Sequence, residues 1–152
     1  MELILWRHAD AEYFGNDMHR KLTTKGSQQA TKVAKWLKSR LSHPWRLICS
    51  PAIRARETAI ALSPNLEIVE SILPGSDSNS LLTAANWPKA KHTVIVVGHQ
   101  PTIGQTVAHL MGLEENEWIV EKGSIVWLSQ DSQLESNTRE VVIKVAITPE
   151  LI

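Results

Sequence analysis

An unbroken run of β-branched residues, Thr-Val-Ile-Val-Val at positions 93–97, constrains the fold of this chain more than any other feature. Successive side chains of a strand point to opposite faces of the sheet. A run with no polar alternation therefore indicates a strand that is buried on both faces, as in parallel sheets covered by helices. The run predicts a strand within a layered α/β fold.

Strands and helices are predicted to alternate around this run. Three short apolar runs predict further strands: Glu2–Trp6, Arg46–Cys49 and Leu66–Val69. Helical spacing or capping residues predict four helices: Thr24 to about Leu41, Ser50-Pro51 (as N-cap and first residue) to about Leu62, about Leu81–Asn86, and a segment opened by Pro101. Two final strands, 124–129 and 140–147, are expected to pair in antiparallel fashion across a polar stretch, 130–139.

This order of elements predicts a three-layer sandwich, with a mostly parallel central sheet and helices on both faces. No internal repeat and no linker interrupts the pattern, and 152 residues suit one compact domain with its own core. We therefore expect residues 1–152 to form a single domain.

Composition argues against several classes of partner and location. The chain has 16 basic and 16 acidic residues, and this balance argues against binding to nucleic acid or to an anionic membrane surface. No apolar stretch approaches the roughly 20 residues of a membrane span, and we expect no secretory leader. The single cysteine, Cys49, cannot form an internal disulfide, so we predict a cytoplasmic protein.

Cations and imidazoles follow three of the predicted strands. Arg7-His8 follows the first strand, Arg54 lies shortly after the second, and His99 follows the run at 93–97. Parallel strands end at one edge of a sheet, where ligands bind, so these side chains are expected to meet there. Concentrated positive charge favours an anion, and phosphate matches the donor geometry of arginine. The helix that begins near Pro51 would add its positive dipole end.

A histidine in such a site predicts nucleophilic catalysis on phosphorus. If one ring nitrogen donates to a backbone carbonyl, the other keeps a lone pair aimed at the substrate. Arg7, Arg54 and His99 would neutralise the phosphoryl charge, so we expect neither a metal nor a cofactor. Cys49 lies four intervening residues before Arg54, whereas a cysteine phosphatase requires five.

Four sequence blocks, in order, resemble those of the histidine phosphatase superfamily, also called the phosphoglycerate-mutase-like fold. The blocks are Trp6-Arg7-His8-Ala9-Asp10-Ala11, Leu22 to Ala30, Ser50-Pro51-x-x-Arg54-Ala55-x-x-Thr58-Ala59 and Val97-Gly98-His99-Gln100-Pro101. The short length and Asp10-Ala11 resemble the SixA-type phosphohistidine phosphatases, which lack a cap domain. Two departures are Ala9, in place of the usual glycine, and Lys21, where short members often have proline.

The resemblance implies a role for each residue of the site. His8 would be the nucleophile that forms a phosphohistidine intermediate, and Arg7, Arg54 and His99 would bind phosphate, with Arg20 near the pocket. Asp17 is chosen as general acid because short members often have an aspartate just before that arginine. The remaining candidates for the acid are Glu70 and Asp77.

The predicted activity is removal of phosphate from phosphohistidine on a signalling protein, such as a histidine phosphotransfer domain. A site without a cap would be open to a protein surface, with Trp6 and the loops around Asp17 and Asp77 as the docking surface. A P–N bond also needs less acid catalysis than a phosphoester, because its imidazole leaving group can already be protonated. Two alternatives are a phosphatase of small phosphoesters and a non-catalytic phosphoprotein-binding domain.

Overall fold

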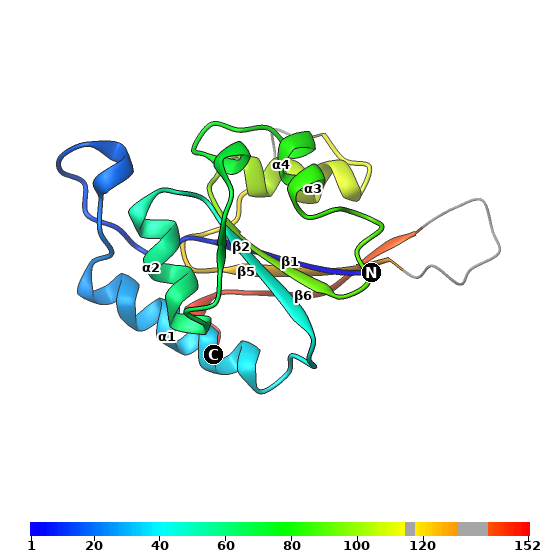
Figure 1. The fold of residues 1–152 in the computed structure, drawn as a ribbon, viewed down its shortest axis with the longest axis horizontal. Helices are drawn as coiled ribbons and strands as arrows, with labels where there is room; N and C mark the ends of the chain where they lie inside the picture. The colour runs from blue at the N-terminus through cyan, green and yellow to red at the C-terminus, as the bar shows by residue number, and fades with distance from the viewer. Residues whose placement is uncertain (115–117, 131–139) are drawn as a thin grey trace.

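A six-stranded sheet forms the centre of the molecule in a computed structural model, which describes residues 1–114, 118–130 and 140–152 (Figure 1). Its strands are β1 (Glu2–Arg7), β2 (Trp45–Cys49), β3 (Glu67–Ile68), β4 (Thr93–Gly98), β5 (Ile125–Gln130) and β6 (Val141–Ile147). The order across the sheet is β3-β2-β4-β1-β5-β6. The first four strands in this order are parallel, and β5 is antiparallel to both β1 and β6. The predicted mostly parallel sheet and the antiparallel final pair are confirmed.

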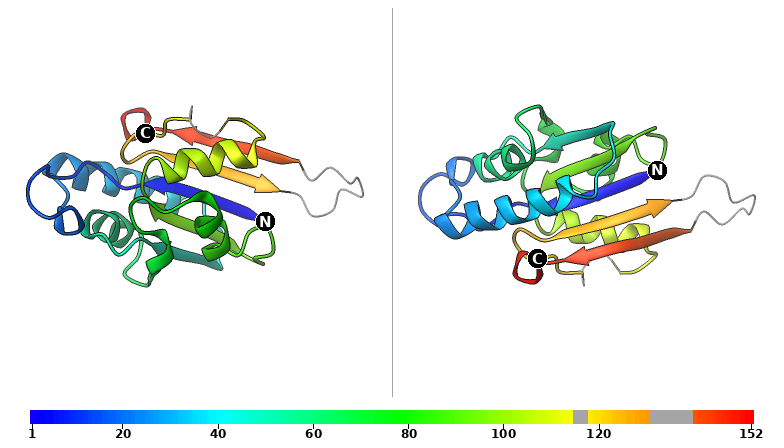
Figure 2. Two further views of the ribbon diagram at one scale, coloured as in Figure 1. Left: turned by 90° about the horizontal axis from the view of Figure 1, so that it is seen from above. Right: turned by 90° about the horizontal axis from the view of Figure 1, so that it is seen from below.

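Helices cover both faces of the sheet, as the two views of Figure 2 show. The helices are α1 (Thr24–Lys38), α2 (Ile53–Leu62), α3 (Ser78–Ala84) and α4 (Thr102–Leu110), with short 3-10 turns at Asp17–His19, Glu70–Ile72 and Pro149–Leu151. Alternate residues of β1 divide between two cores: Ile4 packs with α1 and α2, and Leu5 packs with α3 and α4. The predicted three-layer sandwich is confirmed. The described part of the chain has no cap domain, and none of its helices is long and apolar enough to cross a membrane.

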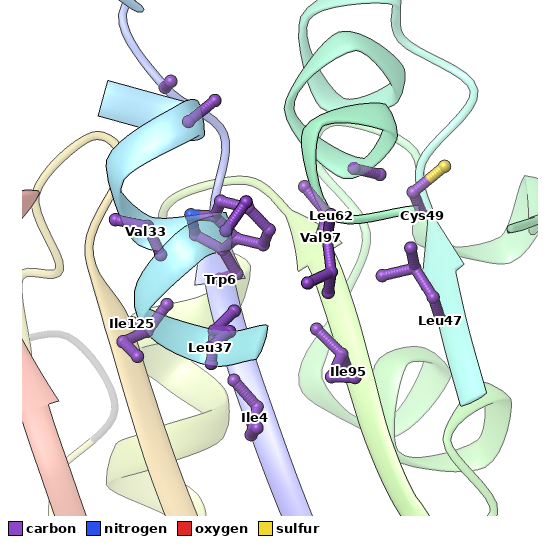
Figure 3. Close-up of a cluster of buried hydrophobic side chains, with 14 of the residues drawn as sticks. Ile4, Trp6, Val33, Leu37, Leu47, Cys49, Leu62, Ile95, Val97 and Ile125 are labelled. Atoms are coloured by element: carbon purple, nitrogen blue, oxygen red, sulfur yellow. The ribbon is translucent and has the colours of Figure 1, made fainter. Parts of the chain in front are cut away.

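Trp6 lies in the hydrophobic core and not at the rim of a pocket. Its side chain is fully buried beside Val33 and Leu37 of α1 (Figure 3). The indole Nε1–H donates to the Gly123 carbonyl at 3.0 Å, so the one polar atom of the ring is satisfied. The expectation that Trp6 forms part of a docking surface is therefore wrong, because an even-numbered residue of β1 points into the α1–α2 layer.

Several predicted boundaries differ from the structure. Helix α2 begins at Ile53, and its N-cap, Ala52, makes no side-chain capping bond, so the predicted cap at Ser50 is wrong. Helix α3 begins earlier than expected because the Asp77 side chain caps it by accepting from Ser80 N at 2.7 Å. Strand β3 is only two residues long, and both are exposed. The polar connection between β5 and β6 lies, over residues 131–139, outside the described residues.

The register of the parallel strands brings the three predicted segments to one edge of the sheet. Arg7 lies opposite Gly98, and Cys49 lies opposite Val97. One residue further along, His8 N donates to Gly98 O at 3.0 Å and Ser50 N donates to Val97 O at 3.1 Å. The residues that follow β1, β2 and β4 are thus held at the same level by backbone hydrogen bonds.

Helix α1 supports the loop that follows His8 through a close backbone contact. Thr23 caps the helix by accepting from Gly26 N, and Thr23 N donates to Asp10 O at 3.1 Å. A Cβ atom on Gly26 would lie 1.9 Å from Asp10 O, which is far inside van der Waals contact. Glycine at position 26 is therefore required by the approach of the helix to this loop.

We predict that Gly26→Ala destabilises the fold, because either the helix or the Asp10 loop must move. The expected loss of unfolding free energy is about 1–3 kcal/mol, measured by urea denaturation. Ser27→Ala, at the neighbouring exposed position of the same helix, is the matched control and should leave stability unchanged or slightly higher. Equal stability of the Gly26→Ala protein and the wild type would show that the contact is not required.

Candidate active site

A cleft of about 600 Å³ opens at the carboxyl edge of the parallel strands. It is lined by Arg7, His8, Tyr13, Gly15, Asp17, Arg20, Arg54, Pro74, His99, Gln100 and Lys122. The structure therefore brings together all six residues that the sequence analysis placed in the site. Of the alternative acids, Glu70 and Asp77 are both exposed and neither lines this cleft.

The imidazole of His8 is fixed in one orientation at the base of the cleft. Its Nδ1 lies 2.8 Å from Ala9 O, and this acceptor places the ring proton on Nδ1. Its Nε2 therefore carries the lone pair of the ring, and this lone pair accepts from Arg54 Nε at 3.3 Å. Burial, with repulsion from Arg54 and Arg7, lowers the pKa of His8 to about 4. His8 is consequently neutral near pH 7, the state in which imidazole is a nucleophile.

The segment around His8 is tied to helix α2. Ala9 N donates to Thr58 Oγ1 at 3.1 Å, and this hydroxyl donates in turn to Arg54 O at 2.7 Å. Ala9 is completely buried and has no positive φ, so its methyl group needs no strained backbone. The departure from glycine at this position is therefore accommodated within the core.

The guanidinium of Arg54 lies between the two histidines and the Asp17 loop. The residue is only 3% exposed. Its Nη2 contacts His99 Nδ1 at 3.4 Å and Asp17 Oδ2 at 3.3 Å, and its Nη1 donates to Asp17 O at 2.6 Å. Burial lowers the pKa of Arg54, although arginine remains charged at any physiological pH. A buried, permanent cation thus contacts both imidazoles.

Arg7 supplies a second cation with an unused donor. Its Nη1 donates to Val120 O at 2.8 Å, whereas its Nε–H is buried and has no partner among the described residues. A buried N–H without an acceptor is costly, and the same guanidinium lines the cleft. Arg7 and Arg54 together make the cleft strongly electropositive.

His99 is held from both sides of its ring. Its Nε2 lies 2.7 Å from Ser50 Oγ, and its Nδ1 lies 3.4 Å from Arg54 Nη2. Burial, with repulsion from His8 and Arg54, lowers the pKa of His99 to about 3. His99 is therefore neutral in this state. Ser50, expected only to cap a helix, instead contacts a histidine of the cleft.

Asp17 is the one carboxyl group among the described residues that line the cleft, and it is ion-paired. Its carboxylate accepts from Arg20 at 3.0 Å and from Arg54 at 3.3 Å. Burial alone would raise the pKa of Asp17, but the hydrogen bond from Arg20 and the charge of Arg54 outweigh it and lower that pKa. A carboxyl group with a lowered pKa is a poor proton donor at neutral pH. This geometry does not favour the predicted role of Asp17 as general acid.

The rim carries residues that the sequence analysis did not identify. Lys122 pairs with Asp10 at 3.0 Å and lies 3.4 Å from the Tyr13 hydroxyl. Tyr13 and its neighbour Phe14 are 78% and 88% exposed. Lys122 comes from the loop before β5, outside every recognised block, so no sequence spacing connected it with His8. Within the described residues, no group of three His, Cys, Asp or Glu side chains is arranged to hold a metal ion.

Comparison with known proteins identifies the family of this chain. The profile of the histidine phosphatase superfamily (branch 1) matches residues 3–74. A phosphohistidine phosphatase SixA homolog of Haemophilus influenzae is 34% identical over 128 residues, which cover 74% of this chain and 78% of that protein. Phosphohistidine phosphatase SixA of Escherichia coli is 29% identical over 119 residues. These residues cover 72% of this chain and 74% of the Escherichia coli protein.

A solved structure extends the similarity to nearly the whole chain. A candidate SixA from Nakamurella multipartitia superposes with a TM-score of 0.80 at 26% identity, and covers 97% of this chain and 95% of its own. Three observations point to the same family. They are the four sequence blocks, the capless sandwich with its phosphoglycerate-mutase-like fold, and these similarities to known proteins. The chain belongs to the histidine phosphatase superfamily, in its short SixA-type branch.

Proposed function

We propose that this protein is a metal-independent phosphatase in which His8 is the nucleophile. The observation that carries the proposal is the bond from His8 Nδ1 to Ala9 O, which leaves the Nε2 lone pair in a cleft beside two arginines. A domain that only bound phosphoproteins would need the cations but not an aimed, neutral imidazole. Phosphatase activity is also what the family similarity supports.

The proposed reaction has two steps. His8 Nε2 attacks phosphorus, the bond from phosphorus to the leaving group breaks, and a phosphohistidine intermediate forms. Water then attacks phosphorus, the P–Nε2 bond breaks, and inorganic phosphate leaves while the water proton passes to solvent or phosphate. Arg7 and Arg54 hold the equatorial oxygens, and His99 contributes a further contact to one of them.

We propose phosphohistidine on a signalling protein as the substrate. Asp17 is ionised and ion-paired, so the described lining of the cleft offers no protonated carboxyl group for an alkoxide leaving group. The imidazole that leaves a phosphohistidine can already carry its proton, and this substrate tolerates the lack of an acid. Relatives named as phosphohistidine phosphatases support the same substrate class.

The docking surface for such a protein is proposed at Tyr13 and Phe14. Tyr13 lines the cleft and Phe14 is its exposed neighbour in the chain, and aromatic residues commonly anchor protein interfaces. Their loop is held by Arg20 Nη1, which donates to Glu12 O at 3.0 Å, and by Glu12 N, which donates to Lys21 O at 2.9 Å. The residue that precedes the aromatic pair is thus held to the Arg20–Lys21 segment.

We predict that His8→Ala abolishes turnover of phosphohistidine and leaves the protein folded. During turnover, wild-type protein should carry acid-labile phosphate and the variant should carry none, as detected with radiolabelled substrate. His92→Ala, at an exposed position away from the cleft, is the control and should retain full activity. Turnover by the His8→Ala protein at the wild-type rate would contradict the nucleophile assignment.

We predict that Asp17→Asn tightens binding of inorganic phosphate and changes phosphohistidine turnover by less than about threefold. The reason is that the substitution removes the negative charge that competes with phosphate for Arg54. Phosphate affinity would be measured by calorimetry and turnover by phosphate release. A general acid contributes about hundredfold or more, so a loss of that size would instead restore Asp17 to the acid role.

We predict that Phe14→Ser lowers kcat/KM about tenfold for a phosphorylated phosphotransfer domain and leaves kcat/KM for free phosphohistidine unchanged. The aromatic ring should contact the protein around the phosphohistidine but not the phosphoryl group itself. Ile60→Ser, which removes another exposed apolar side chain, on α2 and outside the lining of the cleft, is the control. An equal effect on both substrates, or none on either, would remove Phe14 from the docking surface.

A further inference from the structure

Ser50 lies behind His99, and its side chain contacts this histidine of the cleft lining. The residue is completely buried and is not among those that line the cleft. Its Oγ lies 2.7 Å from His99 Nε2 and accepts from Ala52 N at 3.3 Å. The backbone bond from Ser50 N to Val97 O fixes its distance from the histidine. Ser50 is therefore placed to act on the ring of His99 and not on a substrate.

In the structure as it stands, the neighbours of His99 determine its tautomer. Arg54 can only donate hydrogen bonds, so His99 Nδ1 must accept from Arg54 Nη2. The ring is neutral, and its single proton then lies on Nε2. Ser50 Oγ accepts that proton in the 2.7 Å contact. In this tautomer the nitrogen of His99 that faces Arg54 and the cleft is an acceptor.

A phosphoryl group in the cleft requires the opposite arrangement. Phosphoryl oxygens accept hydrogen bonds, so a ring nitrogen that contacts one of them must carry a proton. Donors of Arg54 that now contact His99 and Asp17 would be drawn to the phosphoryl oxygens. If His99 stays neutral, its proton must lie on Nδ1, and Nε2 then needs a donor. The Ser50 hydroxyl is within reach to supply one.

We infer that Ser50 is a positioning residue that allows His99 to exchange tautomers when phosphate binds. While Arg54 donates to His99 Nδ1, Ser50 accepts from His99 Nε2–H. When phosphate is bound, Ser50 donates its hydroxyl proton to Nε2, and Nδ1–H donates to the phosphoryl group. A solvent proton adds to Nδ1 from the cleft, and the Nε2 proton returns to solvent when the contact with Ser50 opens transiently, so the ring remains neutral. The inference rests on the proposed phosphate site but not on turnover.

Only a hydroxyl satisfies both states at this position. Serine is a donor and an acceptor, and its proton rotates to suit its partner. Alanine provides neither function and would leave a buried ring nitrogen without a partner in both states. A lysine or an amide with a fixed orientation would favour one tautomer. The chemistry of Ser50 therefore matches a histidine that must change its hydrogen-bonding role.

Nitrogen NMR of the wild-type protein tests the exchange directly. Protein labelled with ¹⁵N-histidine would be titrated with inorganic phosphate, and the His99 signals assigned with His99→Gln. The inference requires Nε2–H without phosphate and Nδ1–H with it. Retention of Nε2–H in the presence of bound phosphate would overturn it. A doubly protonated ring would also overturn it, because His99 would then act as a cation and Ser50 would remain an acceptor.

A variant tests the contribution of Ser50. Ser50→Ala should weaken phosphate binding about tenfold and abolish the phosphate-dependent tautomer exchange. Ser124→Ala is the matched control, because Ser124 is a buried serine whose hydroxyl has no partner among the described residues. Phosphate-induced exchange in the Ser50→Ala protein equal to that of the wild type would exclude a role for Ser50. Both readouts use binding alone, so a lack of phosphatase activity would be distinguished from failure of this inference.

Discussion

The register between β1, β4 and β2 is the constraint on which the rest of the site depends. Backbone bonds place His8 beside Gly98 and Ser50 beside Val97, and His99 follows one residue later. A shift of one residue would turn every side chain of a strand to the other face of the sheet. The two imidazoles, with ring centroids 5.3 Å apart, are thus brought together by the backbone and not by attraction between them.

The charges in the cleft explain why these imidazoles stay neutral. Buried guanidiniums beside His8 and His99 oppose a further positive charge, and burial acts in the same direction. Neutral histidines keep a lone pair on His8 and a single ring proton on His99. Asp17 balances part of the cationic charge until an anion enters. The arrangement of charges in the site therefore suits an anion.

The sequence revealed those parts of the site that lie close to a strand end. Arg7, His8 and His99 each lie within a residue or so of a predicted strand terminus, and the parallel arrangement predicted their convergence. The role of Ser50 depends on a hydrogen bond across 49 positions, and Lys122 pairs with a residue 112 positions away. Such contacts follow from packing of the whole fold, which neither periodicity nor local spacing reports. The burial of Trp6 was missed for the same reason.

The segment before β5 holds the first strand through its main chain. Val120 O accepts from Arg7, Gly123 O accepts from Trp6, and Gly123 N donates to the carbonyls of Arg7 and His8. Every residue type has a carbonyl oxygen. The bonds to Val120 O and Gly123 O therefore do not depend on the side chains of this segment. Lys122 lies within this segment and projects to the rim of the cleft. The rim of the cleft can thus diverge during evolution, one side chain at a time, while the main-chain support of β1 is inherited intact.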